Sequence, residues 1–290
     1  MLRKSEHSPV APIFILGPPR AGTTLIYQAL VCRYRVAYFC NLANKYSLCP
    51  AFITWLAART VGISPPQSFE STYGESAARF APSQGNRIWA RWFPGPQQYY
   101  SADEVSEQII DELRQTVLSM QSALNCPFAN KSIGHSVRIN PLIRAFPTLV
   151  ILRLRRDPQQ IAESILCGRR EYFGDESQWF SVRPRDFDRI KCLSPIQQVC
   201  EQVRCVEQDI DLDSQATCSD RVFDISYEAF CKSPRILLAD FAQFYHRVTG
   251  LKLQPRREIP EAFTVSTRKK VSDAEREAII ADFQRMECTG

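Results

Sequence analysis

The feature that most constrains the fold is a glycine-bounded loop near the N-terminus, which lies between an apolar run and a helical pattern. Residues 12–17 (PIFILG) have the length and apolar content of a buried strand, and residues 24–32 follow as a helix. The loop starts at Gly17 and closes with Gly22-Thr23-Thr24. Backbone N–H groups in such a loop, together with the dipole at the helix start, bind a phosphate group. The sequence therefore predicts an anion site where this strand ends.

The rest of the chain continues the alternation of strand and helix. Two more apolar runs, residues 149–154 and 221–227, predict buried strands. Capping side chains stand before proline at positions 157–158 and 194–195, where helices are expected to begin. This pattern predicts an α/β fold of three layers, in which a mostly parallel sheet is flanked by helices, as in P-loop-like nucleotide-binding proteins.

No linker rich in Pro, Gly or Ser divides the chain, so we expect a flexible tail over residues 1–11 and a single domain over residues 12–290. Residues 62–100 are rich in Pro, Ser, Gly and aromatic side chains and are expected to be irregular, with a short hairpin. A long irregular stretch inside a compact domain usually serves function. Its aromatic run, residues 86–94, is expected to form either the wall of an acceptor pocket or part of the ordinary core.

Composition excludes several classes of protein. The net charge of +5 is too mild for a nucleic-acid-binding protein and fits a small anionic ligand. No run of about 18 apolar residues predicts a membrane span, and the first eleven residues lack the apolar stretch of a signal peptide. The eleven cysteines form no C-x-x-C pair, which favours reduced thiols in the cytoplasm. Three well-separated histidines predict no metal site.

The glycine loop departs from the loop of nucleotide-hydrolysing enzymes in one informative way. The separation of its two glycines is the same, but Thr23 stands where those enzymes carry lysine, and the cation has moved inward to Arg20. That lysine normally reaches the β- and γ-phosphates. Its loss argues against an ordinary triphosphate site, whereas Arg20 and the threonine hydroxyls can still hold a smaller anionic group.

A second anion motif follows the strand at residues 149–154. Asp157 is expected to cap a new helix, with Arg156 at its mouth and Ser164 two turns along. Alone, the R-D-P sequence is weak evidence, because Asp-Pro is also a plain helix start.

Together the two motifs resemble the family of sulfotransferases that use 3′-phosphoadenosine 5′-phosphosulfate (PAPS), in its bacterial-type branch. That family pairs a 5′-phosphosulfate loop of the type P-[RK]-[SA]-G-T-T with a 3′-phosphate motif in which Arg and Ser stand eight apart. The resemblance implies a sulfotransferase fold and PAPS as co-substrate, without a metal. The matching residues are Pro19, Arg20, Ala21, Gly22, Thr23 and Thr24 in the loop, and Arg156 and Ser164 in the 3′-phosphate motif.

Weaker similarities extend the resemblance toward the C-terminus. Tyr227-Glu228 resembles a family motif whose tyrosine lies near the adenine, although Ala and Phe follow here. Ser266 and Lys270 fall where many members place a late loop that closes on the cofactor.

Transfer of a sulfuryl group to a hydroxyl requires a base for the proton and cations for the charge that builds on the bridging oxygen. Histidine suits the first task, and His7 in the tail and His246 in an amphipathic helix are poorly placed for it, which leaves His135. The order of Lys131 and His135 before the R-D-P motif also resembles bacterial-type sulfotransferases. The resemblance implies His135 as base, with Arg20 and Lys131 supporting the leaving group.

A carboxylate base is the alternative, because tyrosylprotein-type members with an arginine in the loop use a glutamate. Glu70 and Glu75 lie in the irregular stretch where a substrate loop is expected. Both can equally be solvated loop side chains.

The sequence thus predicts an in-line transfer from PAPS to a hydroxyl, which releases 3′-phosphoadenosine 5′-phosphate (PAP). A phosphotransferase with a modified phosphate loop and a non-catalytic nucleotide-binding protein are the competing hypotheses. The acceptor is left open as a small molecule, a carbohydrate or a lipid with a hydroxyl group, and so is the oligomeric state.

Overall fold

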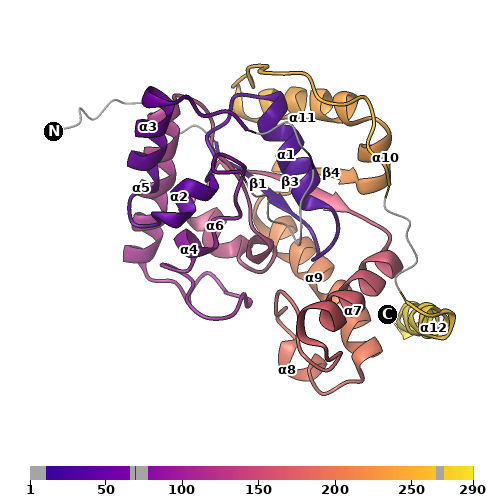
Figure 1. Cartoon of the computed structure of the whole chain (residues 1–290). Helices are drawn as coiled ribbons and strands as arrows, with labels where there is room; N and C mark the ends of the chain where they lie inside the picture. The colour runs from indigo at the N-terminus through magenta and orange to yellow at the C-terminus, as the bar shows by residue number, and fades with distance from the viewer. Residues whose placement is uncertain (1–10, 66–68, 70–77, 266–270, 290) are drawn as a thin grey trace.

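A four-stranded parallel sheet forms the centre of the molecule (Figure 1). The structure is a computed structural model, and it describes residues 11–65, 69, 78–265 and 271–289. The strand order is β2-β1-β3-β4. The strands are Ile13–Leu16 (β1), Ala129–Lys131 (β2), Val150–Arg155 (β3) and Val222–Ser226 (β4).

Helices cover both faces of this sheet, as predicted. One face packs on α1, α10 and α11, and the opposite face packs on α5, α6 and α9 (Figure 1). The helices are Thr23–Arg33 (α1), Asn41–Lys45 (α2), Pro50–Thr60 (α3), Asn86–Trp89 (α4), Glu107–Leu124 (α5), Ile139–Ala145 (α6), Pro158–Phe173 (α7), Phe187–Ile190 (α8), Pro195–Thr217 (α9), Tyr227–Lys232 (α10), Pro234–Thr249 (α11) and Asp273–Thr289 (α12), with 3₁₀ turns at Ile133–Val137 (η1) and Ser219–Arg221 (η2).

The predicted strands are present within one residue of their expected ends, with one difference in burial. β1 is buried throughout, and β3 is buried up to its last residue. β4 lies at the sheet edge, where only Ile225 is fully buried. β2 was not predicted, because a three-residue strand that ends in lysine has no apolar run.

Helix starts follow the capping chemistry expected from the sequence. The Asp157 carboxylate accepts the N–H of Gln159, with Pro158 in the first turn of α7. Ser194 and Gln197 form a capping box at the start of α9. These caps matter for the site, because the first one fixes the helix that follows the second anion motif.

The stretch 62–100 is partly outside the described residues. Within the described part it contains a short helix, α4, and no paired hairpin strands. The aromatic run contributes Trp89, Trp92 and Phe93 to the buried core, so core packing, rather than a pocket wall, accounts for these three side chains.

Ala11, the last residue of the expected tail, is buried, and its carbonyl accepts a hydrogen bond from Tyr245. Residues 1–10 of that tail lie outside the described residues. No helix in the described part of the chain is long and apolar enough to cross a membrane.

Candidate active site

The glycine loop lies where β1 ends, at the edge of the sheet where all four parallel strands have their carboxyl ends. This edge is where α/β proteins of this type bind ligands. The Ser136 hydroxyl, from η1, donates to the carbonyl of Gly17 (2.9 Å) and accepts its N–H (3.2 Å). The turn that follows β2 therefore holds the start of the loop in place.

Gly22 is required at the other end of the loop for two physical reasons. Its φ of 99° lies in the left-handed region, which side chains with a Cβ disfavour. A Cβ built there would also collide with ring carbons of Tyr227. The first turn of α1 has no side-chain cap and no acidic residue, so its N–H groups suit an anion.

The second anion motif joins the loop directly. Arg156 donates from Nη1 to the backbone carbonyl of Arg20 (3.1 Å), and its guanidinium carbon lies 4.3 Å from the centre of the Tyr227 ring. Arg20 in turn donates from Nε to the hydroxyl of Ser164 (3.0 Å). Two motifs that are far apart in the sequence therefore contact each other in the structure.

Positive charge is concentrated at this site. Burial, reinforced by Arg156, lowers the pKa of Arg20 below its usual value. Arg20 also has a φ of 69°, which is uncommon for a residue with a side chain and marks backbone strain. Two neighbouring, partly buried cations repel each other, which makes their charged forms less favourable. A bound anion would offset this repulsion.

Lys131 adds a further cation from the end of β2. Its Nζ donates to the hydroxyl of Thr24 (3.1 Å), so it reaches the first turn of α1. Burial and the nearby Arg20 lower the pKa of Lys131 to about 7. A lysine at this point can switch between charged and neutral forms near neutral pH.

His135 lies behind this cluster and is fully buried. Its ring meets the rings of Phe14 and Trp89 edge-on, at centroid distances of 5.1 and 4.5 Å. The hydrogen bonds around it fix its protonation. The indole N–H of Trp89 donates to Oδ1 of Asn130 (3.0 Å), so the group that Nε2 of His135 meets at 2.8 Å is an oxygen, and Nε2 carries the proton.

The Nδ1 atom of His135 consequently holds a lone pair, and it is buried without a hydrogen-bond partner among the residues that the structure describes. Burial, with Arg138 and Lys131 nearby, lowers the pKa of His135 well below its usual range, so the ring is neutral at pH 7. A neutral ring with an unused lone pair has the protonation state of a base. Its burial means that an acceptor hydroxyl reaches it only after neighbouring side chains move.

The structure also identifies two residues that the sequence analysis missed. Asn130 holds His135 in its tautomer and donates from Nδ2 to the carbonyl of Ser83 (3.2 Å). Arg138 is buried against Gly134, with its guanidinium carbon 4.5 Å from the centre of the Phe93 ring, and burial lowers its pKa to about 10. Asn130 sits beside the Lys131–His135 pattern and could have been found from it, whereas no motif contains Arg138.

The remaining sequence-predicted site residues divide into two groups. Pro19, Ala21 and Thr23 are buried parts of the loop, and Tyr227 begins α10. Four others lie outside the described residues, namely Glu70, Glu75, Ser266 and Lys270.

Comparison with known proteins identifies the family and the fold. The model of the sulfotransferase family matches residues 12–245. The crystal structure of the sulfotransferase STF9 from Mycobacterium avium superposes with a TM-score of 0.54 at 15% identity, covering 96% of this chain and 69% of that one. STF1 from Mycobacterium tuberculosis H37Rv gives a TM-score of 0.48 at 13% identity, covering 96% and 74%.

The sulfotransferase domain of the curacin biosynthetic pathway gives a TM-score of 0.47 at 15% identity, and covers 96% of this chain and 99% of that domain. No protein of curated function matches the chain. Since the family model extends over most of the sequence, from before the glycine loop into α11, the chain belongs to the sulfotransferase family.

Proposed function

We propose that the protein transfers a sulfuryl group from PAPS to a hydroxyl of an acceptor and releases PAP. The observation that carries this proposal is the contact of the two anion motifs, in which Arg156 donates to the backbone of Arg20 while Arg20 donates to Ser164. A ligand with a phosphate at each end of one ribose needs two such motifs side by side. An ordinary nucleoside triphosphate needs one loop with a lysine and a Mg²⁺ ion.

Residues of this chain fit the two ends of PAPS. The N–H groups at the start of α1, with Arg20, Thr24 and Lys131, would hold the 5′-phosphosulfate, and Arg156 with Ser164 would hold the 3′-phosphate. Tyr227, stacked under Arg156, would border the adenine. PAPS itself supplies an activated sulfuryl group whose leaving partner is a phosphate.

Lys131 and Arg20 are the cations best placed to stabilise charge on the leaving phosphate. Both are held at the loop, Lys131 by Thr24 and Arg20 by Ser164. The reaction forms a bond from the acceptor oxygen to sulfur and breaks the bond from sulfur to the phosphate oxygen, and the acceptor proton must leave. We propose Nδ1 of His135 as the group that takes this proton. This nitrogen carries a lone pair, and His135 is next to Ser136, which bonds to Gly17 of the loop.

Calorimetric titration with PAP, with ATP plus Mg²⁺ as the parallel ligand, tests the proposal. We expect PAP to bind in the absence of any metal and ATP with Mg²⁺ to bind far more weakly. Binding of ATP with Mg²⁺ but not of PAP would overturn the proposal in favour of a phosphotransferase. Binding of PAP without turnover of PAPS with any hydroxyl compound would favour the non-catalytic alternative.

A further inference from the structure

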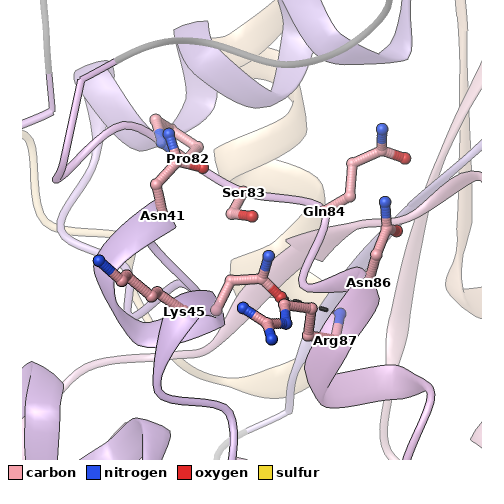
Figure 2. Close-up of a pocket in the computed structure, with 8 residues that line it drawn as sticks. Asn41, Lys45, Pro82, Ser83, Gln84, Asn86 and Arg87 are labelled. Carbon is pink, nitrogen blue, oxygen red and sulfur yellow. Dashed lines mark hydrogen bonds between the residues drawn. The ribbon is translucent and has the colours of Figure 1, made fainter.

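A polar pocket lies beside the Lys131–His135 segment, which it contacts through Ser83 and Gln84. It encloses about 210 Å³ between α2 and the start of α4. Figure 2 shows Asn41 and Lys45 on one side of it and Gln84 and Asn86 on the other. We call it the amide pocket, and its lining residues are Asn41, Asn44, Lys45, Pro82, Ser83, Gln84, Asn86 and Arg87.

The amide pocket contacts the segment formed by β2 and η1, which carries the candidate catalytic residues. The Oε1 atom of Gln84 accepts the backbone N–H of Ile133 (3.3 Å), two residues beyond Lys131. The carbonyl of Ser83 accepts the side-chain amide of Asn130 (3.2 Å), which also holds His135. A molecule in this pocket would therefore lie against the same short segment as the groups proposed for proton and charge transfer.

Hydrogen bonds orient two of the amide groups so that they present donors. Gln84 uses its oxygen for the N–H of Ile133, and Asn44 uses its oxygen for the N–H of Arg87 (3.0 Å, dashed in Figure 2). Because a backbone N–H can bond only to the oxygen of each amide, the NH₂ groups remain to donate to a ligand. Groups fixed in this way favour oxygen atoms with lone pairs over donor groups.

Charge favours an anion at the same place. Lys45 and Arg87 are exposed lining residues, and no lining residue is acidic. The two segments that build the pocket lie in stretches without any Asp or Glu, which extend over residues 7–69 and 76–102. Carboxylates from these segments therefore do not offset the two cations, and the charge of the lining residues favours an anion.

We propose that the amide pocket binds the acceptor, and that the acceptor is a hydroxylated molecule that carries an anionic group such as a carboxylate or a sulfate. This inference rests on the proposed sulfuryl transfer. The anionic group would lie against Arg87 and Lys45, and the NH₂ groups of Gln84 and Asn44 would hold hydroxyl oxygens. The pocket is smaller than the roughly 300–1,000 Å³ of sites for drug-sized ligands, so it suits one ring or one charged substituent of the acceptor.

A matched pair of probes tests the charge preference. We would titrate the PAP-saturated protein with 4-nitrophenyl β-glucuronide and with 4-nitrophenyl β-glucoside, which differ only by a carboxylate in place of a hydroxymethyl group. We expect the glucuronide to bind about tenfold more tightly, and the Arg87→Gln variant to lose that preference. The control is Arg91→Gln, which removes the same charge from an exposed arginine outside the pocket and should leave the preference intact.

The outcomes separate this inference from the proposed function. If the wild-type protein binds PAP but binds both glycosides equally, or binds neither, the inference is overturned and the donor site stands. Failure of PAP to bind would instead overturn sulfuryl transfer, and the same glycoside pair without nucleotide would still report on the pocket. Loss of PAP affinity in Arg87→Gln would place the pocket in the donor site and also overturn the inference.

Discussion

The two regions proposed to bind donor and acceptor are built in different ways. In the donor region, formed by residues 17–24 with Lys131, Arg156, Ser164 and Tyr227, most polar side chains are buried and contact a residue of another motif. In the amide pocket, the donors come from α2 and from the segment that leads into α4, and its cations are exposed. We therefore expect binding in the first region to depend on the backbone conformation of the loop, and binding in the second to depend on the charge and orientation of individual side chains.

The two regions should therefore differ in how much a single substitution disturbs them. A change in the loop affects the backbone conformation, a buried ring and a buried cation at once. A change at Arg87 or Lys45 affects one exposed side chain. If the comparison is right, substitutions in the donor region should cost much more than substitutions in the pocket, and each should affect one ligand only.

The largest effect is expected from Gly22→Ala. The added Cβ would collide with the ring of Tyr227 at a φ of 99°, so the loop must change shape. We expect calorimetry to show a loss of PAP affinity of more than about a hundredfold. Gly95→Ala is the matched control, because Gly95 has a similar φ of 82° and open space around it. Equal PAP affinity in the two variants would contradict the role of the loop.

His135→Ala tests whether His135, in the segment of β2 and η1 that both regions contact, is the general base. We expect turnover to fall by about a hundredfold, as for loss of a general base, with little change in PAP affinity. His135→Gln keeps a donor for Asn130 without a basic nitrogen, and should lose turnover while it retains the melting temperature better than His135→Ala. His246→Ala, at an exposed position on α11, is the control. Full activity in His135→Gln would remove His135 from catalysis.

Arg156→Ala should weaken PAP binding by about thirtyfold, in the range for loss of a charge-assisted hydrogen bond. Adenosine 5′-phosphate, which lacks the 3′-phosphate, should lose much less. The neighbouring Arg155→Ala is the control, because Arg155 is half-exposed and pairs with Asp224. Equal losses for both nucleotides would mean that the 3′-phosphate lies elsewhere.

The donor region could be predicted from the sequence because its chemistry is local. A glycine loop between strand and helix, and an Arg-Asp-Pro start of α7, each specify their own backbone, and the parallel sheet brings their ends together. The strands β1 and β3 followed from apolar runs for the same reason. β2 did not, since its three residues are buried by tertiary packing and not by any pattern of their own.

The amide pocket could not be predicted, because no single segment contains it. Asn44 and Gln84 present donors only after the backbone N–H groups of Arg87 and Ile133 have taken their oxygens. The burial of His135 was equally beyond the sequence, since it depends on Phe14 and Trp89 from separate elements. Both features depend on contacts between residues far apart in the sequence, and the Asn and Gln residues of the pocket are of types common on any protein surface.

A pH dependence should appear in the donor region alone. In the free protein the pKa of Lys131 is lowered to about 7 by burial and Arg20. A bound anion stabilises the protonated lysine, so PAP affinity should fall as pH rises above about 7, by at most tenfold per unit. Lys131→Met should lack this slope, as measured by calorimetry at about pH 6.5 and about pH 8.5. The same slope in both proteins would assign it to PAP or to another group.

The smallest effect, and the sharpest test of the pocket, is expected from Gln84→Glu. A carboxylate at this position can still accept the N–H of Ile133, so the backbone at Lys131 should stay in place and PAP affinity should not change. The NH₂ donor is replaced by a charged oxygen, which repels an anionic acceptor but not a neutral one. We expect glucuronide affinity to fall about fivefold and glucoside affinity to stay within about twofold. Equal losses for both glycosides would show that Gln84 acts by holding the backbone at Ile133. The pocket could then not be treated as separate from the donor region.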